Sequence, residues 1–146
     1  MIQEYADGVE FGADVYVDLL SGQTVSIFTK EKIRMKAGET DKSVSVKDDK
    51  LFQLILDFTG KTPFRGIIDM DLYRVGGEYR ILEVNPRFGG GYPHAYGCGV
   101  NVPKMIINNL NGFVNKVNIG DYEEGVCMMK YSEAKIIKLK DYKKNS

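Results

Sequence analysis

The sequence has few of the side chains that build zinc sites and disulfide frameworks. It contains 2 cysteines and 1 histidine among 146 residues. Cys98 and Cys127 lack a CxxC spacing, which argues against a zinc set formed with His94. We therefore expect two reduced, buried thiols. We also expect His94 to be bonded locally in a loop rather than to act as a general base, because it has no fixed partner.

The sequence also lacks an excess of charge of one sign and any long apolar run. Lys plus Arg number 20 and Asp plus Glu number 20, so the formal net charge is zero. This balance argues against broad electrostatic binding to nucleic acid or to an anionic membrane. No apolar run approaches the roughly 20 residues that span a bilayer. We expect a cytoplasmic protein that has neither nucleic acid nor a membrane as its partner.

Alternating apolar and polar residues, which are typical of strands, dominate the first half of the chain. Phe11, Ala13, Val15 and Val17, for example, share one face of an extended segment. The expected strands are Met1–Tyr5, Glu10–Leu20, Gln23–Lys30, Lys32–Lys36, Ser43–Val46, Phe64–Val75, Glu78–Val84, Tyr122–Tyr131 and Ala134–Leu139. The expected helices begin at a cap provided by Asp48 or Asp49 and at Asn101, and they end at Gly60 and Asn111-Gly112. We expect one α+β domain over residues 1–146, with a mainly antiparallel sheet and two or more helices.

The polar positions of one expected hairpin, residues 64–87, are acidic rather than neutral. Asp69 and Asp71 share a face of the first strand, and Glu83 and Asn85 share a face of the second. A two-residue turn at Gly76-Gly77 would place Asp71 opposite Leu82. A three-residue turn that includes Glu78 would instead pair Asp71 with Glu83 and Asp69 with Asn85. We favour the second register because it buries the apolar residues of both strands together, namely Ile68, Met70, Leu72, Leu82 and Val84.

Clustered carboxylates repel one another unless a cation lies between them. Oxygen ligands with an amide oxygen nearby suit magnesium or manganese, and substrate phosphates usually complete the coordination. Arg87, two residues beyond Asn85, is well placed to bind phosphate or carboxylate. The alternative is a solvated sheet face whose acids only keep the strand soluble. The glycine-rich loop from Phe88 to Pro93 favours the metal site, since glycine lets backbone approach a ligand closely.

The run EVNPRFGGG, which follows a strand carrying IDMDL, resembles the C-terminal part of the ATP-grasp fold, in its carbamoyl-phosphate-synthase-like and carboxylate–amine ligase branch. The resemblance implies that Glu83 and Asn85 hold magnesium, which bridges the phosphates of ATP. Asp71 best matches the remaining ligand, and Asp69 is the alternative if the hairpin loop is longer. Arg87 is then the expected catalytic residue.

The beginning of the chain, IQEYADGVEFGADVY, resembles the segment of these ligases that holds adenine on its backbone. This likeness implies that residues 3–6 lie along the adenine and that Glu10 binds the ribose hydroxyls. Lys36, within RMKAGE, would lie near the phosphates. The expected nucleotide-binding residues are Gln3, Glu4, Tyr5, Ala6, Glu10 and Lys36.

The resemblance implies an ATP- and magnesium-dependent ligase that activates a carboxylate as an acyl phosphate, which an amine then attacks. Its relatives carry an earlier half with two phosphate-binding lysines, and this chain starts at the adenine segment. We therefore expect a missing N-terminal half as a partner and little activity from this chain alone. Two alternatives stay open, a non-catalytic nucleotide-binding or regulatory module of the same fold and an unrelated α+β domain.

Overall fold

The computed structural model describes residues 7–138. Its strands form a six-stranded antiparallel sheet in the order β5-β4-β1-β2-β3-β6. The strands are β1 (Val9–Val17), β2 (Thr24–Lys36), β3 (Glu39–Val46), β4 (Gly66–Val75), β5 (Glu78–Asn85) and β6 (Cys127–Met129), and the helices are α1 (Asp49–Gly60), α2 (Tyr92–Gly97) and α3 (Val102–Leu110). This arrangement confirms the expected α+β class.

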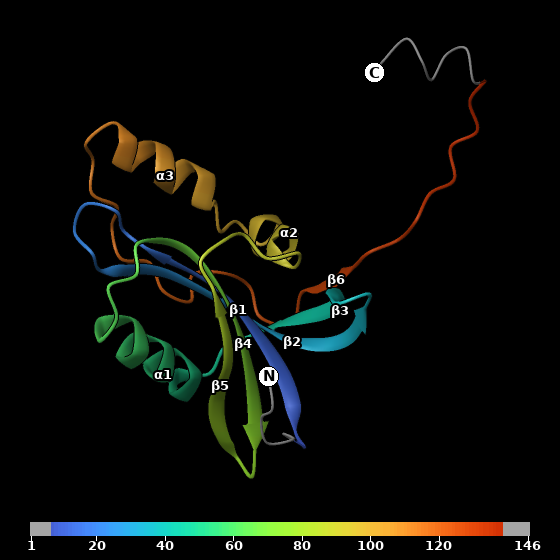
Figure 1. The fold of residues 1–146 in the computed structure, drawn as a ribbon, viewed down its shortest axis with the longest axis horizontal. Helices are drawn as coiled ribbons and strands as arrows, with labels where there is room; N and C mark the ends of the chain where they lie inside the picture. Colours follow the sequence, from blue (N-terminus) through green and yellow to red (C-terminus); the bar gives the residue numbers. More distant parts are fainter. Residues whose placement is uncertain (1–6, 139–146) are drawn as a thin grey trace.

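The sheet is covered on both faces, by α1 on one face and by α2 and α3 on the other (Figure 1). The expected alternation of β1 is confirmed, because Phe11, Ala13, Val15 and Val17 all lie in the core beneath α1. Tyr16, on the opposite face of β1, is buried against α2 and α3. β1 pairs with both β2 and β4, so this central strand fixes the relative positions of residues on three strands.

The helix ends follow local chemistry. Asp48 caps α1, since its carboxylate accepts hydrogen bonds from the backbone N–H groups of Lys50 and Leu51, as an N-cap residue does. Asn101 caps α3 by accepting from the N–H of Lys104. Residues 92–97 form α2, where the sequence predicted only loop, because six residues are too few to show a helical period.

Several predicted strand limits were wrong. β2 runs unbroken to Lys36, and β3 begins at Glu39 rather than Ser43, because Ala37 and Gly38 form a tight turn with positive φ values of 52° and 79°. Only Cys127–Met129 of the segment 122–131 is strand. Tyr122 instead holds this segment against the sheet, through hydrogen bonds between its hydroxyl and Thr29 and the Val46 carbonyl. Residues 134–138 form no strand, and Met1–Tyr5 lies outside the described part.

The acidic hairpin has the predicted pairing but not the predicted turn. Asp71 lies opposite Glu83 and Asp69 opposite Asn85. Val75 pairs with Glu78, so the turn has two residues, and a bulge at Leu82 shifts the register back. Ile81 and Val84 therefore both pack on the core, a spacing that a regular strand does not allow. Leu82, which we predicted to be buried, is 39% exposed.

Two further sequence expectations can be compared with the described residues. Cys98 and Cys127 are both free, but neither is fully buried as expected, since Cys98 is half-buried and Cys127 is exposed. No helix within residues 7–138 is long and apolar enough to cross a membrane.

Candidate functional site

The predicted metal-binding residues lie in one open groove of about 560 Å³. Register brings Asp71 and Glu83 together across β4 and β5, and Asn85 follows Glu83 on the same strand. The groove is lined by Lys32, Met35, Gly38, Glu39, Thr40, Asp69, Asp71, Glu83, Asn85, Arg87, Phe88 and Gly89, Gly90 and Gly91. The structure therefore collects the whole predicted metal set and Arg87 at one end of the β4–β5 hairpin.

The groove offers a magnesium ion three oxygen-bearing side chains, those of Asp71, Glu83 and Asn85. Hard cations prefer such oxygen ligands, and magnesium usually keeps several waters or phosphate oxygens besides one or two carboxylates. Within residues 7–138 no three acidic, histidine or cysteine side chains are placed to hold a metal. The described acids therefore form no complete metal site by themselves, and a magnesium ion bound here would need further oxygen ligands from water or phosphate.

Asp69, the alternative metal ligand, is already engaged by Arg87. The Nη1 atom of Arg87 lies 3.1 Å from Oδ2 of Asp69 and 3.0 Å from the carbonyl oxygen of Phe88, to which it also donates. Burial raises the pKa of Asp69, and repulsion by Asp14 and Asp71 raises it further. The Arg87 side chain is 58% exposed, so it reaches into the groove from its open side.

The three glycines after Phe88 pack directly on charged side chains. A Cβ on Gly89 would collide with the Asp69 carboxylate, one on Gly90 would lie 2.9 Å from the carboxyl carbon of Glu39, and one on Gly91 would lie 2.8 Å from Nζ of Lys30. The sequence suggested that these glycines let backbone approach a ligand. The structure gives them a second role, since a side chain at any of these positions would displace a charged side chain, either Asp69, Glu39 or Lys30.

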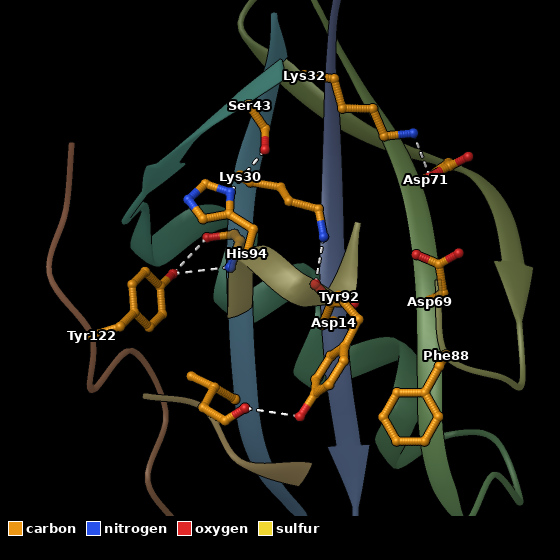
Figure 2. A network of polar contacts seen from close by, with 12 residues as sticks. Asp14, Lys30, Lys32, Ser43, Asp69, Asp71, Phe88, Tyr92, His94 and Tyr122 are labelled. Atoms are coloured by element: carbon orange, nitrogen blue, oxygen red, sulfur yellow. Dashed lines mark hydrogen bonds and ion pairs between the residues drawn. The ribbon is translucent and has the colours of Figure 1, made fainter. Parts of the chain in front are cut away.

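Lys32 is the main site residue that sequence reasoning missed. Its ammonium lies 2.6 Å from Oδ1 of Asp71 and 2.7 Å from Oε1 of Glu10 (Figure 2 shows the Asp71 contact). Tyr73 donates its hydroxyl to the other oxygen of Glu10 at 3.3 Å. Burial alone would lower the pKa of Lys32, but hydrogen bonds to Asp71 and Glu10 outweigh it and raise this pKa. A lysine thus joins the predicted ribose-binding acid to a predicted metal ligand.

A second lysine, Lys30, forms an ion pair with Asp14 beneath the glycine-rich loop (Figure 2). Both side chains are almost fully buried, and Oδ1 of Asp14 has no hydrogen-bond partner among the described residues. Lys30 and Lys32 both pass close to Gly12 of β1, where a Cβ would lie 3.0 Å and 3.2 Å from their Cε atoms. Gly12 therefore leaves the space for two lysines of β2, of which Lys30 pairs with an acid of β1 and Lys32 reaches acids of β1 and β4.

His94 has neither the loop position nor the local bonding that we predicted. It lies in α2, where Nδ1 is 2.8 Å from Oγ of Ser43 and Nε2 is 3.0 Å from the Val126 carbonyl oxygen. A carbonyl only accepts, so Nε2 carries the proton and Nδ1 accepts from Ser43. Burial lowers the pKa of His94. This imidazole, which is 3% exposed, ties α2 to the sheet.

Four of the remaining predicted nucleotide-binding residues, Gln3, Glu4, Tyr5 and Ala6, lie outside the described residues. The fifth, Lys36, is described and is not brought to the acids. Lys36 lines a neighbouring groove of about 560 Å³, which shares Glu39 and Thr40 with the acidic one. Its binding to phosphate stays a prediction.

Comparison with known proteins agrees with this fold. A family model described as "ATP-grasp in the biosynthetic pathway with Ter operon" matches residues 1–134. No curated protein matches the chain. N5-carboxyaminoimidazole synthetase from Staphylococcus aureus, in complex with ADP, superposes with a TM-score of 0.60 at 14% identity over 79% of this chain and 34% of that one.

Two further solved structures share the fold. An L-amino acid ligase from Bacillus licheniformis gives a TM-score of 0.51 at 20% identity, over 77% of this chain and 31% of that chain. A single-chain, multi-domain long-chain acyl-CoA carboxylase gives 0.57 at 13% identity, over 78% of this chain and 13% of that chain. The chain thus spans about a third or less of the length of these proteins.

Proposed function

The chain belongs to this ATP-grasp family, and from that membership we propose that it supplies the magnesium- and nucleotide-binding part of an ATP-dependent ligase of the carbamoyl-phosphate-synthase-like type. The ligase would join a small-molecule carboxylate to an amine. The observation that carries the proposal is the pairing of Asp71 with Glu83, beside Asn85, in one open groove. We further propose that residues 1–146 are one domain, a partial ATP-grasp domain that works with an N-terminal half.

Each side chain has a distinct part in this proposal. Asp71, Glu83 and Asn85 would hold magnesium, and the metal would neutralise charge on the β- and γ-phosphates of ATP. Arg87 would turn from Asp69 to a phosphate oxygen, since its exposed guanidinium can reach the groove. Glu10 would accept hydrogen bonds from the ribose hydroxyls, and the backbone of residues 3–6 would lie along the adenine. Lys36 would lie near the phosphates.

The chemistry is two successive transfers. A carboxylate oxygen of the first substrate attacks the γ-phosphorus, and ADP leaves, which gives an acyl phosphate. The amine then attacks the acyl carbon, and inorganic phosphate leaves as the amine loses its proton. Phosphoryl transfer depends on positive groups and correct placement around the whole phosphate. Because this chain would supply one side of that arrangement, it should show almost no ligase activity by itself.

The test is manganese binding, measured by electron paramagnetic resonance with and without a non-hydrolysable ATP analogue. Asp71→Asn and Glu83→Gln should each weaken binding by about tenfold or more, because each removes a charged ligand. Glu78→Gln is the matched control, since Glu78 is exposed at the turn end of the same strand and should leave affinity unchanged. An equal response from the wild type and both site variants would contradict the metal assignment. Measurable ATP-dependent ligation by the isolated chain would contradict the proposed half-site.

A further inference from the structure

Lys32 lies between Glu10 and Asp71, which the proposed function assigns to the ribose and to magnesium, respectively. Its ammonium bonds to Glu10 and Asp71 at 2.7 Å and 2.6 Å, and its side chain is 4% exposed. The two acids come from β1 and β4, while Lys32 comes from β2 and reaches them by crossing β1 over Gly12. One buried cation thus joins Asp71, which lines the groove, to Glu10, which is not among the residues that line it.

The charges around Asp71 make this cation important. Glu83 lies directly opposite Asp71, and Asp69, on the same face of β4, is paired with Arg87. Lys32 is therefore the cation that balances Asp71 within the described residues. A divalent ion bound to Asp71 and Glu83 would lie within a few ångströms of the Lys32 ammonium. Like charges at such a distance repel strongly in a partly buried site.

We propose that Lys32 competes with a divalent cation for Asp71, so that the groove takes up the metal together with an anionic phosphate ligand rather than as a bare ion. This inference rests on the proposed metal-binding function of Asp71. A polyphosphate would bring several negative charges into the groove, and these offset the repulsion between metal and ammonium. Without that anion, Lys32 keeps Asp71 occupied. Lys32 is thus a positioning residue that sets the order in which the site is filled.

The first experiment compares the affinity of four versions of the chain for free manganese, measured by electron paramagnetic resonance. Lys32→Met removes the competing charge, so it should bind manganese about tenfold more tightly than the wild type. Lys32→Arg keeps the charge and should resemble the wild type. Lys42→Met is the matched control, because it removes the same charge from a neighbouring groove. If Lys32 has only a structural role, the folded Lys32→Met chain should bind manganese with the same affinity as the wild type.

Asp71→Asn separates the two proposals. If Asp71→Asn loses manganese binding while Lys32→Met binds like the wild type or more weakly, the competition by Lys32 is refuted but the metal site stands. If Asp71→Asn binds manganese as well as the wild type does, the metal site is refuted, and the inference about Lys32 falls with it. Tighter binding by Lys32→Met than by the wild type supports both.

A second measurement needs no variant and covers the case in which Lys32→Met does not fold. The ammonium of a buried, hydrogen-bonded lysine exchanges its protons slowly and can be followed by nitrogen-detected magnetic resonance. Saturating magnesium together with a non-hydrolysable ATP analogue should release Lys32 from Asp71 and speed this exchange, whereas millimolar magnesium alone should change it far less. An ammonium signal that stays unchanged with magnesium and the analogue together would overturn the proposal.

Discussion

The buried ion pair between Lys30 and Asp14 allows a quantitative prediction. The two side chains are 1% and 0% exposed, so water cannot take over the role of a missing partner. Removing one partner of a buried pair leaves an uncompensated charge and usually costs about 3–5 kcal/mol of unfolding free energy. Lys30→Met should therefore be strongly destabilising, since the Asp14 carboxylate would remain in the core beside Asp69.

The double variant should behave differently from the single ones. Oδ1 of Asp14 has no partner among the described residues, so the native pair is incompletely satisfied. Replacing both partners by apolar residues of similar size is often neutral or stabilising. Asp14→Val combined with Lys30→Met should thus recover most of the stability that Lys30→Met loses, and the coupling between the two changes should be several kcal/mol.

Urea unfolding followed by circular dichroism measures this directly. With a slope of about 2 kcal/mol per molar urea, a loss of about 4 kcal/mol moves the midpoint by about 2 M. Lys130→Met is the control, since Lys130 pairs with Glu39 at the surface and its loss should hardly move the midpoint. If the losses of the two single variants simply add in the double variant, the reasoning about a buried, mutually dependent pair is refuted.

Two further predictions concern pH and the hairpin turn. Burial alone would raise the pKa of Asp18, but hydrogen bonds from Ser21, Asn109 and Asn115 hold this pKa well below its usual value. The ionised form of Asp18 therefore stabilises the fold. The melting temperature should fall as the pH drops below about 4, where the unfolded chain begins to take up this proton. Asp18→Asn should flatten this dependence, and an unchanged slope would contradict the assignment. Gly76 and Gly77 have φ values of 59° and 86°. Gly77→Ala should therefore lower the free energy of unfolding in urea by about 1 kcal/mol. Gly76→Asn should be tolerated, because the pair Asn-Gly suits this turn. Equal losses of stability in both variants would show that the turn geometry is not the cause.

The sequence was sufficient for features that depend on neighbours along the chain. The alternation of β1, a helix cap at Asp48 or Asp49 and the pairing of Asp71 with Glu83 were all predicted from local patterns, and the structure has them, with Asp48 as the cap. The pairing was predicted for a partly wrong reason, because a bulge at Leu82 rather than a third turn residue sets it. Bulges leave little trace in a strand pattern that still alternates on either side of them.

The missed features depend on contacts between distant segments. Lys32 reaches Asp71 across 39 positions of sequence, and this contact exists only because β2 and β4 flank β1 at Gly12. The bonds of His94 to Ser43 and Val126 likewise join three segments. A lysine inside an alternating strand is normally a solvated residue, so no single-residue signal in the sequence would have marked Lys32. The sequence pattern that could have indicated this contact is the combination of Lys30 and Lys32 on one face of a strand with Gly12 on the preceding strand.

The space that Gly12 leaves for Lys32 also means that local opening of the sheet would change the net charge of the groove. The acids Glu10 and Asp71 lie on β1 and β4, which pair with each other without β2. Their shared cation lies on β2, whose other neighbour is β3, and only the three-residue strand β6 lies beyond β3. If the β2–β3 hairpin detaches before β1 and β4 separate, the groove loses its lysine while keeping its acids. Hydrogen exchange in β2 would then report a transient, more acidic form of the site, which would bind divalent cations before the rest of the domain unfolds.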